Sequence, residues 1–155
     1  MKKINNNYFK KAMAKFATGI TVITINDEDN FIGKTVSSFS SLSLNPPLIL
    51  FSLDKKSSSL SKFIKNKSIG INILSNKQKN ISIHFSKKDN KWDSIKYYLS
   101  NRNIPMIKNS LVNLSCKNTR TISAGDHIIF VCEIIEIDIS TKNKPLIYLE
   151  SNYLK

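Results

Sequence analysis

The stretch Gly33-Lys34-Thr35-Val36-Ser37-Ser38-Phe39-Ser40-Ser41 carries five hydroxyl side chains and lies between two short apolar runs, 20–25 and 48–53. Both runs are rich in β-branched residues, which predicts a strand on each side of the stretch. Asn45-Pro46-Pro47 marks a turn before the second strand. Hydroxyls and free backbone N–H groups at a strand end can hold a phosphate or a flavin, but the pattern also suits a polar strand and turn on a barrel rim.

Four further motifs stand at fixed positions around this stretch. They are Phe16 to Thr24 (FATGITVIT), Ser43 to Leu48 (SLNPPL), Gly125-Asp126-His127, and Pro145 to Tyr148 (PLIY). In this order and spacing, the five motifs together resemble the flavin reductase-like family, the small reductase components of two-component flavin monooxygenases. The resemblance covers nearly the whole chain, from about Phe9 to Tyr153.

The resemblance implies a mainly β protein: a six-stranded antiparallel Greek-key split β-barrel, the FMN-binding split barrel, with a few surrounding α-helices. It also implies a single flavin reductase-like domain over residues 1–155 and a homodimer. The residue pattern agrees with a small barrel, since strands are predicted at 20–25, 31–39, 48–53, 68–74, 111–118, 128–139 and 145–149. Helices are predicted at 8–16, packing on the barrel, and at 60–66 and 78–85.

The resemblance also assigns roles to particular residues. The flavin ring edge and ribityl chain would be held by the cradle Thr35, Val36, Ser37 and Ser38, and the same pocket would be lined by Ser52, Leu53, Asp54 and Lys55. Ser58 and Ser59 would hold the flavin phosphate at the start of a helix, where Ser57 or Ser58 is also a candidate N-cap. The run Phe85, Ser86 and Lys87 would approach the flavin, although a solvated charge pair explains Lys87 and Lys88 equally well.

The nicotinamide dinucleotide would contact His127 and Tyr148. The alternative for His127 is a turn histidine bonded to neighbouring backbone, and for Tyr148 it is core or interface packing. Two departures from the family pattern stand out. Lys34 occupies a position where a small or apolar residue is usual, and it should point away from the flavin if Thr35 faces it. The tail Glu150-Ser151-Asn152-Tyr153 replaces a common Arg-Gly-x-Tyr pattern.

Charge and composition argue against two classes of function, nucleic-acid binding and membrane association. The net charge of +13 invites a nucleic-acid partner, but only Arg102 and Arg120 are arginines and the lysines are spread along the chain. Aromatic residues lie in apolar periodic segments instead of between basic residues, so no nucleic-acid binding is expected. No apolar run approaches a membrane span, and the basic N-terminus is not followed by a signal core, so we expect a cytoplasmic protein with no membrane contact.

Catalytic side chains are scarce in this sequence. It has no nucleophile elbow, no GxGxxG and only two histidines, His84 and His127, and no metal site is predicted. Cys116 and Cys132 lie in apolar segments and are predicted to be buried thiols. Hydride transfer suits such a chain, because the cofactors carry the chemistry and the protein positions them.

The predicted activity is an NAD(P)H:flavin oxidoreductase. NADH or NADPH would reduce FMN, with FAD as the less favoured flavin, and the reduced flavin would supply a partner oxygenase component. The alternatives are a flavin-binding protein for storage or sensing without turnover, and a basic β-barrel that binds nucleic acid.

Overall fold

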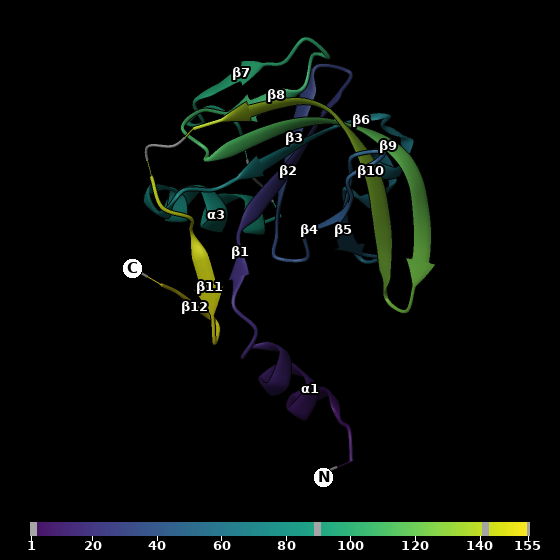
Figure 1. Ribbon diagram of the computed structural model, residues 1–155, viewed down its shortest axis with the longest axis vertical. Coiled ribbons are helices and arrows are strands. Elements are labelled where there is room, and N and C mark those ends of the chain that lie inside the picture. Colours follow the sequence, from purple (N-terminus) through teal and green to yellow (C-terminus); the bar gives the residue numbers. More distant parts are fainter. Residues whose placement is uncertain (1–2, 89–90, 141–142, 155) are drawn as a thin grey trace.

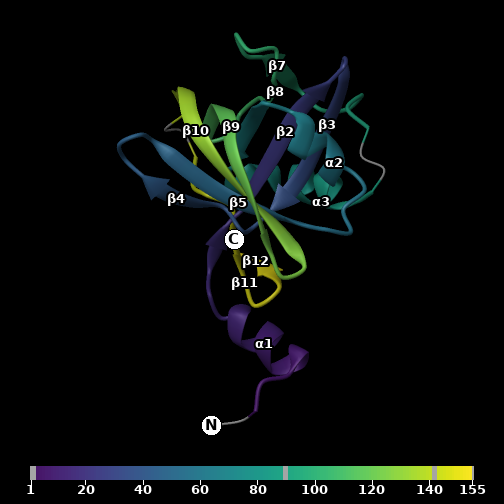
Figure 2. The ribbon, with the colours of Figure 1, turned by 90° about the vertical axis from the view of Figure 1, so that its right-hand side faces the viewer.

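The computed structural model describes residues 3–88, 91–140 and 143–154. Its main element is a seven-stranded antiparallel sheet in the order β3-β2-β6-β9-β10-β5-β4 (Figure 1). Its strands are β2 (Thr21–Asp27), β3 (Asn30–Val36), β4 (Ser40–Ser43), β5 (Leu48–Asp54), β6 (Ser68–Ile73), β9 (Val112–Ala124) and β10 (His127–Ile139). The sheet curls until β3 and β5 contact each other without pairing, which leaves the barrel split at that seam (Figure 2).

Smaller elements complete the fold. A three-stranded sheet in the order β1-β11-β12 brings together Thr18–Gly19, Ile147–Leu149 and Asn152–Tyr153. A hairpin is formed by β7 (Tyr97–Leu99) and β8 (Pro105–Ile107). The helices are α1 (Asn6–Met13), α2 (Leu60–Lys65) and α3 (Lys79–Ser86), with a 3-10 turn η1 (Asn76–Gln78). No helix in the described ranges is long and apolar enough to cross a membrane.

The buried residues form two clusters, one on each face of β2. Ile23 and Ile25 belong to the barrel interior, where Phe51 and Phe130 stack with ring centroids 4.8 Å apart. Val22 belongs to a second cluster on the outer face, which is covered by α3. β2 therefore reads as a nearly continuous apolar run because both of its faces are buried.

A buried asparagine, Asn72, forms hydrogen bonds that connect its own strand β6 to β2, β8 and β9. The side chain of Asn72 on β6 is fully buried and donates to the Val22 carbonyl on β2 (2.9 Å). Its oxygen accepts from the Ile107 N–H on β8 and from the Asn113 amide on β9, both at 2.7 Å. Because each of these groups is buried, the amide satisfies polar atoms that water does not reach.

The mainly β antiparallel architecture is confirmed, with corrections to its details. The main sheet has seven strands in place of the predicted six. The additional edge strand is β4, whose serines lack the β-branched composition by which strands were predicted. The strand predicted to run to Phe39 ends at Val36, and the strand predicted at 111–118 continues to Ala124.

The N-terminal helix is the clearest error. The predicted range was 8–16 with packing on the barrel, whereas α1 spans Asn6–Met13, has no buried residue and projects away from the barrel (Figures 1 and 2). The side chains of Phe9 and Met13 on this helix are more than half exposed. Helical spacing predicts an apolar face, but it does not identify the surface that this face meets.

Both cysteines are free and fully buried, which confirms the predicted buried thiols. Burial raises the pKa of both thiols, that of Cys132 to about 12. The reactive thiolate of Cys132 is therefore much scarcer than for an ordinary thiol. We expect neither Cys116 nor Cys132 to react with a disulfide thiol reagent near pH 8 in the folded protein, and both to react in urea. Rapid labelling of the native protein at either position would contradict the buried assignment.

Candidate functional site

A groove lies where β3 and β5 separate at the barrel seam, with a volume of about 280 Å³. We call it the serine groove. The structure brings together eight of the residues that the sequence assigned to cofactor binding: Thr35, Val36, Ser37, Ser38, Ser52, Leu53, Asp54 and His127. Lys34 and Ser57 also line it. The stretch identified first in the sequence therefore forms one wall of a concave site.

Two of the predicted cradle hydroxyls already have protein partners. The Ser38 hydroxyl accepts from the Ser52 N–H and donates to the Ser52 carbonyl, both at 3.0 Å, so it ties the chain after β3 to β5. The Thr35 hydroxyl donates to the Ser82 carbonyl of α3 (2.7 Å). Within the described part of the chain, the Ser37 hydroxyl has no hydrogen-bond partner. Ser37 is therefore the cradle side chain that is free to bond a ligand.

The opposite wall is built by the turn before β10. His127 pairs in register with Asp54, and its Nδ1 lies 2.7 Å from the Asp126 carboxylate. The hydrogen bond and charge of His127 hold the pKa of the Asp126 carboxyl below its usual value. Gly125 turns the chain with φ +58°, a region that favours glycine. Lys55 secures this turn through its ammonium, which donates to the Gly125 carbonyl (2.6 Å), instead of lining the groove.

A second hollow of about 640 Å³ adjoins the serine groove along β3 and the turn before α2. We call it the lysine pocket, because Lys62, Lys88 and Lys91 line it together with Ser58, Ser59 and Trp92. Two acids, Asp29 and Asp93, also line it. The predicted caps Ser57 and Ser58 were wrong: Ser59 occupies the N-cap position of α2, and its side chain makes no capping hydrogen bond.

Four of the predicted site residues lie elsewhere. The Phe85 ring is fully buried beneath Gly33, so the prediction that it approaches the flavin was wrong; it is a core residue. Ser86 and Lys87 sit at the end of α3 and line neither hollow. Tyr148 belongs to the small sheet, where its ring packs on Tyr153 with centroids 5.1 Å apart. That packing corresponds to the alternative stated for Tyr148 from the sequence.

Sequence reasoning missed Lys34 as a groove residue. The Thr35 hydroxyl faces α3, so strand alternation places Lys34 on the opposite face, the reverse of the expected arrangement. The glycine at position 33 was a usable signal. It leaves room for Phe85 of α3 on the face that Gly33 shares with Thr35, so Lys34 must lie on the other face. Lys34 adds a cation to a site that otherwise presents hydroxyls.

The family model described as "Flavin reductase like domain" matches residues 13–155. The chain belongs to this family. Among curated flavin reductases, the FMN reductase (NADH) SmoA of Agrobacterium fabrum is 34% identical over 131 residues, which cover 84% of this chain and 75% of SmoA. The reductase subunit HsaB of a flavin-dependent monooxygenase from Mycobacterium tuberculosis is 32% identical over 154 residues, covering 97% of this chain and 82% of HsaB.

A solved flavin reductase also matches in three dimensions. The structure of flavin reductase PheA2 superposes with a TM-score of 0.91 at 36% identity and covers 98% of both chains. The split barrel implied by the sequence is therefore the fold of this chain.

The described residues of this flavin reductase fit a flavin nucleotide. The serine groove offers the free Ser37 hydroxyl and the Lys34 side chain. The lysine pocket is lined by three lysines, of which Lys62 pairs with Asp27 (3.0 Å). Ammonium and hydroxyl donors form charge-assisted hydrogen bonds with a phosphate, about twice as strong as neutral ones. Both hollows lie along β3 and the turn before α2, and they present hydroxyl groups in the serine groove and lysine side chains in the lysine pocket.

Proposed function

We propose that this protein is an NAD(P)H-dependent flavin reductase, a single reductase domain over residues 1–155 that reduces FMN, or FAD, with a nicotinamide dinucleotide. The observation that carries the proposal is the serine groove, because residues from separate sequence motifs meet there at the barrel seam. The names of the relatives support the details. SmoA is named an FMN reductase that uses NADH, and HsaB a reductase subunit of a monooxygenase. Supply of reduced flavin to a partner oxygenase follows from that likeness.

The chain's own residues would bind and orient the flavin nucleotide. Ser37 donates to the flavin ring edge or ribityl chain, while Ser38 fixes the wall by holding Ser52. Ser58 and Ser59, with the lysines of the lysine pocket, hold the phosphate. When bound, the flavin supplies the hydride acceptor, and the protein contributes position and electrostatics instead of a catalytic side chain.

The nicotinamide dinucleotide would approach from the His127 side of the groove. His127 is held by Asp126 and partly exposed, so its ring can contact a second nucleotide over the flavin. The net charge of +13 attracts both anionic nucleotides over long range. We place the protein in the cytoplasm.

A homodimer is part of the proposal. Ile135, Ile137 and Ile139 alternate along one face of β10 and are about half exposed or more. Leu42 on β4 and the neighbouring Leu44 add further exposed apolar surface. A row of large aliphatic side chains in water is typical of an interface. A second copy of the chain covers this face in the proposed assembly.

The function is tested by following NADH consumption by the purified protein with and without FMN, with NADPH and FAD as parallel arms. Flavin-dependent consumption is the expected result. Flavin binding without consumption would replace the reductase by a storage or sensing protein. No flavin binding at all would leave only the shared fold and would return attention to a nucleic-acid partner.

Replacing Ser37 and Ser38 together by alanine is expected to weaken flavin binding by about tenfold or more, because one free donor and the clasp on Ser52 are both lost. The measurement is fluorescence titration with FMN, with circular dichroism to show an intact fold. The matched control is Ser40→Ala with Ser41→Ala, which changes the same chemistry on β4 outside the groove. An unchanged affinity in the Ser37/Ser38 variant would remove the cradle assignment.

A further inference from the structure

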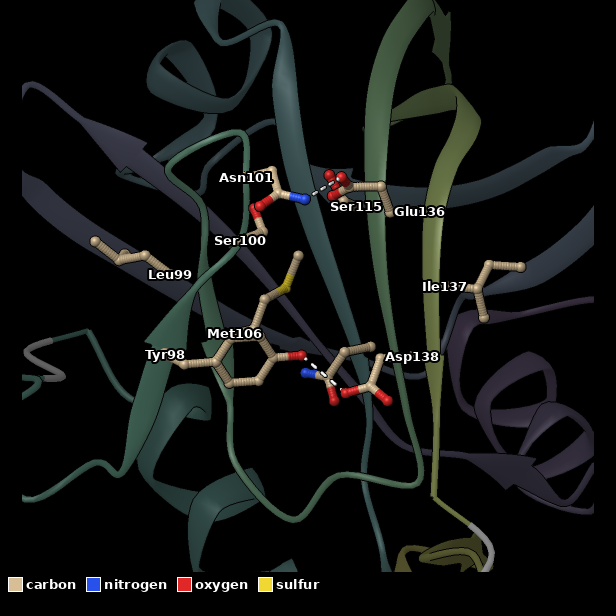
Figure 3. Close-up of a pocket in the computed structure, with 10 residues that line it drawn as sticks. Tyr98, Leu99, Ser100, Asn101, Met106, Ser115, Glu136, Ile137 and Asp138 are labelled. Carbon is tan, nitrogen blue, oxygen red and sulfur yellow. Dashed lines mark hydrogen bonds between the residues drawn. The ribbon is translucent and has the colours of Figure 1, made fainter.

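A third hollow lies between the β7–β8 hairpin and the strands β9 and β10, with a volume of about 330 Å³ (Figure 3). We call it the hairpin pocket. It shares no lining residue with the serine groove or the lysine pocket. Met106 of β8 and Ser115 of β9 line it and are both 2% exposed, and β10 contributes Glu136 and Asp138.

The two carboxylates make this pocket negative in a strongly basic chain. Glu136 accepts from the Asn101 amide (2.8 Å), and Asp138 accepts from the Tyr98 hydroxyl (3.1 Å), so both known partners are neutral. Among the described residues, neither carboxylate forms an ion pair. Burial, the hydrogen bond to Asp138 and the charges of both acids raise the pKa of Tyr98 to about 12.

Ser115 gives an independent indication of a ligand. Its side chain is 2% exposed, and its hydroxyl has no hydrogen-bond partner. A buried polar group without a partner is unfavourable, and in a native fold it calls for an explanation. The strand register places Ser115 directly opposite Glu136, so both side chains face the hairpin, and Figure 3 draws them next to each other.

The spacing of the acids limits what the ligand can be. Glu136 and Asp138 are two residues apart on one strand and share a face, so their backbones lie about 6.6 Å apart along it. Met106 lines the pocket from the hairpin side, across from the two acids in Figure 3, and offers an apolar surface. A metal ion does not suit this arrangement, because the described residues contain no group of three or more potential His, Cys, Asp or Glu ligands.

We propose that the hairpin pocket binds a short aliphatic diamine. One ammonium group pairs with Glu136 and donates to the Ser115 hydroxyl, and the other pairs with Asp138. The methylene chain between them lies against Met106. In extended 1,4-diaminobutane five bonds of about 1.5 Å separate the two nitrogens by roughly 6 Å, which is close to the backbone spacing of about 6.6 Å between Glu136 and Asp138. The site is independent of flavin reduction.

The test is calorimetric titration of the flavin-free full chain at low salt with 1,4-diaminobutane, 1-aminobutane and 1,4-butanediol. We expect one diamine per chain, binding at least tenfold tighter than the monoamine, and no binding of the diol. The double variant Glu136→Gln with Asp138→Asn should lose at least tenfold in diamine affinity. Glu133→Gln, which removes the same charge on the same strand outside the pocket, should bind as the parent does.

Ser115→Ala separates a ligand contact from a structural role. It should weaken diamine binding severalfold while the thermal midpoint stays unchanged or rises, since the hydroxyl has no partner to lose. The proposal is overturned if the diamine does not bind, if it binds no better than the monoamine, or if the Glu136/Asp138 variant binds it normally. None of these results depends on flavin reductase activity, because no flavin is present.

Discussion

Asn72→Leu is expected to lower the free energy of unfolding by about 3 kcal/mol or more. Leucine preserves the approximate size of the side chain but removes every hydrogen bond that the amide makes. The Ile107 N–H then loses its acceptor, the Asn113 amide keeps only its bond to the Ile107 carbonyl (3.2 Å), and the Val22 carbonyl loses a donor, all within the protein interior. Each buried group left unpaired costs about 1–3 kcal/mol.

Urea denaturation measures this loss directly. Asn80→Leu is the matched control, because Asn80 is exposed on α3 and the same change there should alter stability by less than about 0.5 kcal/mol. Loss of less than about 1 kcal/mol in Asn72→Leu would mean that water or a rearranged neighbour satisfies the freed groups. The expected result would instead identify Asn72 as the residue that couples β2, β6, β8 and β9.

Gly33→Ala is expected to destabilise the fold by about 2 kcal/mol. A Cβ at this position would lie 2.4 Å from two ring atoms of Phe85, far inside normal contact. The ring is fully buried and cannot move without disturbing the outer cluster under α3. β3 or α3 must therefore shift, and the packing between them is lost in part.

A double variant identifies the cause. Phe85→Leu removes the ring atoms that the new methyl meets, so Gly33→Ala combined with Phe85→Leu should lose less stability than the sum of the two single variants. Gly19→Ala is the control, since a Cβ there has nothing within 4 Å and should be nearly neutral. Additive losses would show that the Gly33 effect does not come from the Phe85 ring.

The strands and the hydroxyl-rich stretch after Gly33 could be predicted from the sequence, because apolar runs and hydroxyl clusters are visible within a single short segment. No single segment of the sequence indicates which strand ends meet. The prediction that the groove residues lie together therefore rested on the family resemblance. Phe85 was misassigned for the same reason: its motif was recognisable, but the direction of its ring depends on Gly33 in a distant strand. α1 shows the same limit, because its apolar spacing is local and its contact surface is not.

The hairpin pocket was beyond prediction from sequence. Glu136 and Asp138 were visible as interruptions in an apolar strand, but nothing nearby in the sequence indicated that both face the hairpin. Ser115 becomes informative only through its register with Glu136 and its missing partner. Such a site depends on the register between paired strands. Sequence periodicity indicates which residues of one strand share a face, but not which residues of the next strand lie opposite them.

The small sheet has a consequence for biosynthesis. Thr18 of β1 pairs with Tyr148 of β11, and the Ile20 N–H donates to the Leu146 carbonyl, so this strand finds its partner almost a full chain length later. On the ribosome, the segment around Thr18 emerges early and waits until residues 146–148 follow. Contacts between such distant segments form slowly, since a long loop must close first. A chain stalled before residue 146 would therefore leave Ile20 without its partner strand and exposed to chaperones and neighbouring nascent chains.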